Sequence, residues 1–184
     1  LYFLSNPTIN DLGISNNYQL IIKNINTDSK NSADFKEKEN FDISGLLQLN
    51  STFPLEKQNN LYQNILTPKI SMKIAPNHTK NNKNDENKIN VNNIYSLNRI
   101  SKNDTIEGGL SLTYGADYNL INKNQKEILS FKAANNLRID ENPDIPHLNQ
   151  LNQKTSNFFT ETYFKPTNFL DLKYDASIKN NLSE

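Results

Sequence analysis

A strict two-residue alternation runs through IEGGLSLTYGADYNL, residues 106–120. The even positions from Ile106 to Leu120 are apolar except for one Gly, and the positions between them carry Glu, Gly, Ser, Thr, Gly, Asp and Asn. Successive side chains of a β-strand point to opposite faces, so this period predicts a strand with one apolar and one polar face. The apolar face could contact a protein core or lipid, and the alternation alone does not choose between them.

The same alternation recurs along the chain, and helical spacing fits none of these segments better. It is clear in 41–55, 62–75, 127–139 and 168–179, and weaker in 18–25 and 156–166. Several of these segments are at least as long as the roughly 9–11 residues that a tilted strand needs to cross a membrane. Strands of soluble domains usually have about 5–6 residues. The pattern therefore predicts an all-β, antiparallel meander of about seven or eight strands.

The predicted connections alternate in length along the chain. Long connections at 26–40, 76–103 and 140–155 alternate with short ones at 56–61, 121–126 and 165–168. In a meander, successive connections lie at opposite ends of the strands, so all the long ones share one end. Outer-membrane barrels have this asymmetry, with short periplasmic turns and longer outer loops.

Composition narrows the function classes. The 184 residues suit one domain, and 20 basic against 20 acidic residues leave no basic stripe for nucleic acid. Only 35% of residues are hydrophobic, so a large private core would be hard to build. The absence of Cys excludes disulfides, and no run of about 18 apolar residues predicts a membrane helix. Both ends of the sequence look cut, so we expect 1–184 to be part of a β-barrel domain truncated at both ends.

One motif carries a family resemblance. The stretch NRISKNDTIEGGLSLTYG at 98–115 resembles the pattern NRFSGxDRIxxxNxxxxG of LptD, the lipopolysaccharide-assembly family of the outer membrane. The matching positions are Asn98, Arg99, Ser101, Asp104, Ile106 and Gly115. The strands LTPKISMKIAP at 66–76 and FFTETYFKPTNFLDLKYD at 158–175 follow the family's order, and the resemblance spans roughly residues 40–180.

The resemblance implies a fold, a function and partners. The chain would form part of the wall of a large β-barrel in the Gram-negative outer membrane, in the translocon that inserts lipopolysaccharide (LPS) into the outer leaflet. The implied partners are LPS, a lipoprotein plug of the LptE kind, components of the periplasmic Lpt bridge, and membrane lipid. Passage would be guided without bond chemistry, so neither an enzyme nor a cofactor is expected.

Few residues suggest a specific site. Lys69 and Lys73 project from the non-lipid face of one predicted strand, and lysine is a point-charge partner for the phosphates of LPS. Their alternative role is to keep the barrel lumen wet. His78 and His147 lie in polar loops without partner ligands at metal-binding spacing, so no metal site is predicted. No catalytic constellation can be assigned either.

Two alternatives remain open at this point: another porin-like outer-membrane barrel, and a soluble all-β binding or adhesion module. The environment of four apolar residues separates the soluble module from a barrel wall. Leu112, Tyr114, Leu172 and Tyr174 would face a second protein layer in the module, and would face outward in a barrel. In the barrel, Thr113 and Lys173 on the opposite face are expected to reach water.

Overall fold

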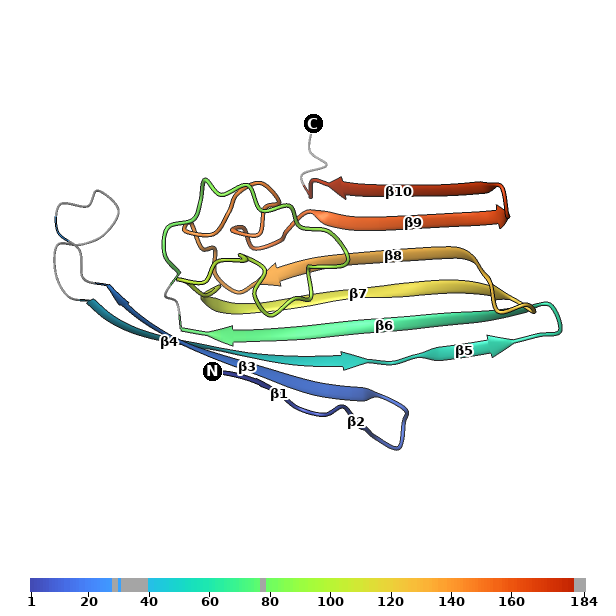
Figure 1. The fold of residues 1–184 in the computed structure, drawn as a ribbon, viewed down its shortest axis with the longest axis horizontal. Coiled ribbons are helices and arrows are strands. Elements are labelled where there is room, and N and C mark those ends of the chain that lie inside the picture. The colour runs from blue at the N-terminus through green and yellow to red at the C-terminus, as the bar shows by residue number, and fades with distance from the viewer. Residues whose placement is uncertain (28–29, 31–39, 77–78, 181–184) are drawn as a thin grey trace.

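The computed structural model is all-β and describes residues 1–27, 30, 40–76 and 79–180 (Figure 1). The strands are β1 (Tyr2–Leu4), β2 (Thr8–Ile9), β3 (Ser15–Thr27), β4 (Asn40–Thr52), β5 (Leu55–Gln58), β6 (Tyr62–Ala75), β7 (Gly109–Asn122), β8 (Glu127–Arg138), β9 (Phe158–Thr167) and β10 (Leu170–Ile178). Among the described residues, no helix is long and apolar enough to cross a bilayer.

All ten strands belong to one antiparallel sheet, in the order β1-β3-β4-β6-β7-β8-β9-β10. The short strand β2 pairs with the start of β3, and β1 pairs with a later part of the same strand. In the same way, β5 pairs with the first part of β6 and β4 with its second part. This path of eight strands confirms the predicted meander, in which strands adjacent in sequence are paired. The expected single strand at 41–55 was wrong, because it breaks at Phe53 and Pro54 into β4 and β5. A proline lacks the N–H that a continuous ladder requires.

The connections fall at the ends that their lengths predict. In Figure 1 the chain leaves β3, β6 and β8 at one end of the sheet, where the long connections lie, and the tight turns before β6, β8 and β10 lie at the other. The β3–β4 connection lies almost entirely outside the described residues. The β6–β7 connection is longer than predicted, because β7 begins at Gly109 and not near Ile106.

One face of the sheet is apolar and uncovered. Tyr114, Leu172 and Tyr174 are 42%, 51% and 68% exposed. Apolar residues pair across the strands on this face, as in Ile70–Tyr114 and Leu172–Phe164, although Asn135 and Thr162 are the polar neighbours of Tyr114 and Tyr174. No second layer of described residues packs on this face, which contradicts the soluble-module alternative and agrees with a barrel wall.

The other face of the sheet is covered, at the end where the long connections lie, by the two described connections, residues 79–108 and 139–157, which we call the loop cap (Figure 1). Its apolar side chains form a core with two inward-facing strand residues, Ala134 and Phe159. The cap members of this core are Ile89, Val91, Ile94, Ile100, Ile145 and Leu151. A smaller cluster joins Leu46 of β4 to Leu97 and Ile106. The hydrophobic core therefore lies inside the curved sheet.

Candidate functional site

Inward-facing polar side chains of the sheet hold the loop cap by its backbone. The Lys23 ammonium on β3 donates to the carbonyl oxygens of Lys102 and Thr105, both at 2.7 Å. The Gln48 amide on β4, which is fully buried, donates to the Tyr95 carbonyl oxygen at 2.7 Å. These bonds satisfy carbonyl groups of an irregular segment that cannot pair in a ladder.

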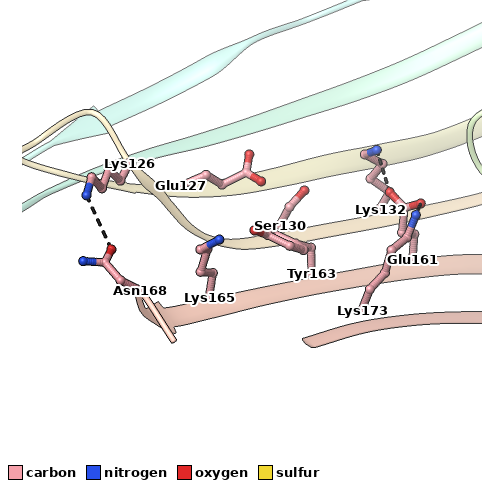
Figure 2. Close-up of a pocket in the computed structure, with 9 residues that line it drawn as sticks. All are labelled: Lys126, Glu127, Ser130, Lys132, Glu161, Tyr163, Lys165, Asn168 and Lys173. Carbon is pink, nitrogen blue, oxygen red and sulfur yellow. Dashed lines mark hydrogen bonds and ion pairs between the residues drawn. The ribbon is translucent and has the colours of Figure 1, made fainter. Parts of the chain in front are cut away.

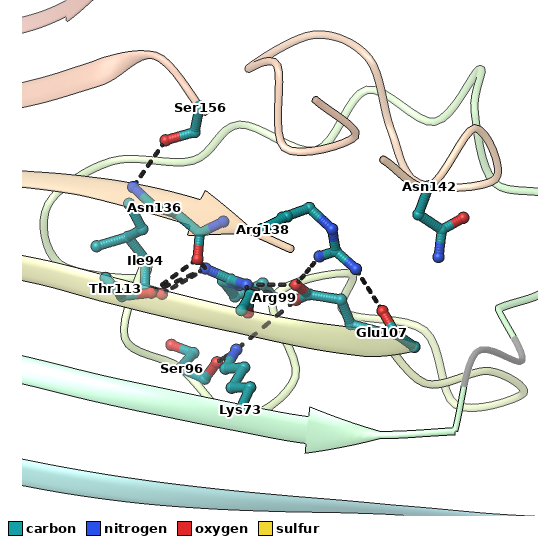
Figure 3. A network of polar contacts seen from close by, with 12 residues as sticks. Lys73, Ile94, Ser96, Arg99, Glu107, Thr113, Asn136, Arg138, Asn142 and Ser156 are labelled. Carbon is teal, nitrogen blue, oxygen red and sulfur yellow. Dashed lines mark hydrogen bonds and ion pairs between the residues drawn. The ribbon is translucent and has the colours of Figure 1, made fainter. Parts of the chain in front are cut away.

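Four charged side chains meet where the loop cap covers β6, β7 and β8 (Figure 3). Glu107, in the cap just before β7, binds the Arg99 guanidinium through both carboxylate oxygens, one of them 2.8 Å from Arg99 Nε. Arg138 Nη1 on β8 lies 2.7 Å from the same carboxylate, and Lys73 Nζ on β6 lies 3.7 Å from it. All four side chains are at most 2% exposed, so this is a fully buried network.

Neutral oxygens complete the shell around the arginines. Arg99 Nη1 donates to Asn136 Oδ1 at 2.7 Å and to Thr113 Oγ1 at 3.1 Å, and Nη2 donates to Ser111 Oγ at 3.0 Å. Arg138 donates to the Gly108 carbonyl oxygen. A planar guanidinium with five donors suits such a dense set of acceptors. Arg99 thereby ties the loop cap to β7 and β8.

The network places three cations around one carboxylate. Burial alone would raise the pKa of Glu107, but the charges of Arg99, Lys73 and Arg138 and the hydrogen bond from Arg99 outweigh it. They hold the pKa of that carboxyl well below its ordinary value. The excess positive charge is balanced by oxygen dipoles, including the Ser96 carbonyl that accepts from the Lys73 ammonium. The network contains no nucleophile beside a base, and its chemistry is that of a structural anchor.

Gly115 on β7 leaves the space that the side chain of Tyr95, in the loop cap, occupies. A Cβ built at this position would meet the Ala133 carbonyl oxygen of β8 and would lie 2.5 Å from the Tyr95 hydroxyl. The Tyr95 hydroxyl is buried and has no hydrogen-bond partner among the described residues. Burial, with a further effect of Asp117, raises the pKa of Tyr95. Only glycine leaves room for Tyr95 to lie against β7.

The family model described as LptD, LPS transport system D, matches residues 9–180 of the chain. The chain belongs to the LptD family. Proteins of this family act in LPS transport and assembly, so the function of this chain lies in that process. LptD is an outer-membrane family whose substrate is LPS and whose partners belong to the Lpt system. A comparison with curated proteins gave no match.

The LptD motif residues lie in three kinds of place: Arg99 in the buried network, Ile106 and Gly115 in packing contacts, and the others in an exposed turn. Arg99 and Ile106 are 2% exposed inside the loop cap. Ser101 has a left-handed backbone (φ 59°), and Asn98 Nδ2 closes the turn by donating to the Lys102 carbonyl oxygen at 3.0 Å. Asp104 is exposed. Gly115 lies on β7 and contacts Tyr95 from the cap.

The two predicted lysines differ sharply in exposure. Lys69 pairs with Asp117, and its side chain is 29% exposed. Lys73 is 1% exposed in the buried network, so the expectation that its face of the strand is wet was wrong at this position. The same holds for Thr113, which is also 1% exposed. Contact of either lysine with LPS phosphate stays a prediction.

Sequence reasoning missed the partners of Arg99. Glu107, Ser111, Thr113 and Asn136 lie up to 37 residues away from Arg99 along the chain. One signal was available: the chain has only two arginines among its 20 basic residues, and both bind Glu107. Arginine, with its bidentate geometry, is preferred over lysine for buried ion pairs.

The described residues hold no group of three His, Cys, Asp or Glu side chains placed to bind a metal ion. His147 lies on the surface of the loop cap, with its Nε2 3.2 Å from the Pro143 carbonyl oxygen. His78 lies outside the described residues.

Proposed function

We propose that this chain forms a section of the wall of the LptD barrel, and that the loop cap closes part of the lumen on the outer side. The observation that carries the proposal is the division of one sheet into an exposed apolar face and an inner face covered by polar-anchored loops. The unpaired outer edges of β1 and β10 are positions where further strands of a larger barrel would continue the ladder.

We propose that the protein lies in the cell outer membrane and guides LPS without bond chemistry. In that orientation the short turns face the periplasm, and the long connections face outward. LPS would arrive from a periplasmic Lpt bridge at the end with short turns. A lipoprotein plug of the LptE kind would share the lumen with the loop cap. The family match and the asymmetry of the connections support this arrangement.

We propose Lys69 and Lys73 as LPS contacts of unequal availability. Lys69 stands beside Asp117 on the inner face and reaches solvent, so a phosphate could exchange for the carboxylate without a change of fold. Lys73 donates to the Ser96 carbonyl oxygen under the loop cap. It would reach a phosphate only after the cap moved away from β6.

The test uses the full-length protein in cells depleted of their own LptD. We expect the wild-type gene to restore LPS at the cell surface and resistance to bulky antibiotics. A version with Arg99→Met, in which Lys73 and Arg138 still compensate the charge of Glu107, should assemble but leave the membrane permeable. Full function of a version lacking residues 79–108 altogether would contradict the role of the loop cap.

A further inference from the structure

A second polar feature lies on the inner face, away from the buried network. It is a groove of about 700 Å³ over β8, β9 and β10, near the end of the sheet with short turns (Figure 2). Its charged lining consists of Lys126, Glu127, Lys132, Glu161, Lys165 and Lys173, and we call it the lysine groove. The volume lies within the range of about 300–1,000 Å³ that is typical of small-molecule sites.

The lysine groove carries more positive than negative charge. Four lysines face two glutamates in its lining, although the chain as a whole has no net charge. Glu161 is shared, because its carboxylate lies 2.7 Å from Lys132 Nζ and 3.0 Å from Lys173 Nζ. One carboxylate therefore serves two ammonium groups.

The other two lysines are available to a ligand. For the Lys126 ammonium group the structure records a single hydrogen bond in the described part of the chain, 3.5 Å to the amide oxygen of Asn168. Lys165 pairs with Asp171 at 3.0 Å, but both side chains are well exposed, at 38% and 51%. Such a solvent-exposed pair contributes little to stability, so Asp171 can be exchanged for a stronger anion.

We propose that the lysine groove binds the phosphate groups on the saccharide part of LPS as it enters the barrel. This deepens the proposed function and rests on it. The lining is charged, whereas the apolar surface that acyl chains require lies on the opposite face of the sheet. The groove adjoins the short turns, which face the periplasm in the proposed orientation. Lysines that are mobile point charges fit a phosphate that must be released again.

Binding of purified LPS to the full-length protein, with its lipoprotein partner and in detergent, tests the proposal. The variant carries Lys126→Glu and Lys165→Glu together. The matched control is Lys123→Glu, an exposed lysine in the short turn between β7 and β8 that is not part of the groove lining. We expect about tenfold weaker binding for the double variant and no change for the control. LPS stripped of phosphate should bind wild type and variant equally.

Further arms separate the possible outcomes. Folding is verified for every variant by heat-modifiable gel mobility, and a milder pair, Lys126→Gln with Lys165→Gln, replaces any variant that fails to assemble. Equal LPS affinity of the wild-type protein and the double variant would overturn the proposal that the lysine groove binds LPS phosphate, but not the proposed function. Competition by phosphatidylglycerol micelles as strong as that of LPS overturns it in favour of a phospholipid headgroup site. Failure of the wild-type protein to bind LPS at all overturns the proposed function itself.

Discussion

Arg99 joins the loop cap to two strands through a single guanidinium. It binds Glu107 within the cap, Thr113 on β7 and Asn136 on β8. Replacing Arg99 by Ala would leave the Glu107 carboxylate buried beside fewer donors. Removing one partner of a buried ion pair typically costs about 3–5 kcal/mol.

We therefore expect Arg99→Ala to free the loop cap, seen as rapid protease cleavage within 79–108 of the assembled protein. The control is Lys102→Ala in the same connection, whose exposed pair with Asp85 at 3.4 Å contributes little. Equal protease resistance of the two variants would show that the buried network does not anchor the cap.

The lowered pKa of Glu107 gives the loop cap a defined response to acid. A carboxyl whose folded-state pKa is depressed contributes its full stabilisation above the unfolded value, about 4.3, and loses it as the pH falls toward the folded value. Protease protection of the cap should therefore decline below about pH 4.3. In the Glu107→Gln variant, protease protection of the loop cap should be weaker at neutral pH and should change less as the pH falls. If this variant kept the pH profile of the wild-type protein, Glu107 would be excluded as the cause.

A third prediction at the scale of single residues concerns Gly115. Gly115→Ala should displace Tyr95 from the sheet or break the pairing of β7 with β8, because the added methyl group meets the Ala133 carbonyl oxygen. Gly45→Ala on β4 is the matched control, since its Cβ would meet only the Ile21 carbonyl oxygen at 3.8 Å. Heat-modifiable gel mobility measures the amount of folded barrel that each of the two variants gives. An equal yield would contradict the close packing of Tyr95 against Gly115.

At the scale of elements, β7 and β10 show what the two faces tolerate. Leu112 and Leu172 lie on the apolar outer face, where an arginine at mid-bilayer costs about 2–4 kcal/mol. We expect Leu112→Arg or Leu172→Arg to impair barrel assembly, with increased permeability to bulky antibiotics as the readout.

The inner face is not uniformly tolerant. Lys173→Gln should be mild because its side chain is 55% exposed. Thr113→Arg should be as harmful as the lipid-facing changes, since Thr113 is buried against Arg99 and a third guanidinium, in addition to those of Arg99 and Arg138, has no room or partner there. This reverses the expectation that every inner position reaches water. Normal assembly with Thr113→Arg would indicate that the loop cap is absent from the assembled barrel.

At the scale of the whole molecule, this chain has two open sheet edges and an uncovered apolar face. Both features promote association in water. We expect residues 1–184 produced alone to aggregate in buffer and to gain β-strand circular dichroism in detergent. A monodisperse protein that melts cooperatively in plain buffer would contradict the assignment of the apolar face to lipid.

Most of the long strands, the two faces of the sheet and the end at which the long connections lie could be predicted from the amino-acid sequence. These follow from a two-residue period and from connection lengths, which are local properties of the chain. Even there, the start of β7 was placed three residues too early, because Ile106 continues the apolar alternation but belongs to the loop cap, where it packs against Leu46 and Leu97.

What covers the inner face of the sheet could be learned only from the three-dimensional fold. The alternation marks Lys73 and Thr113 as polar, but a polar side chain can meet water or buried partners, and the period is the same in both cases. Lys73 contacts Ser96 and Glu107 in the connection 79–108, so these contacts depend on how that connection folds back on the sheet; Asn136 lies opposite Thr113 on the neighbouring strand β8. Such long-range contacts leave no periodic trace in a single sequence.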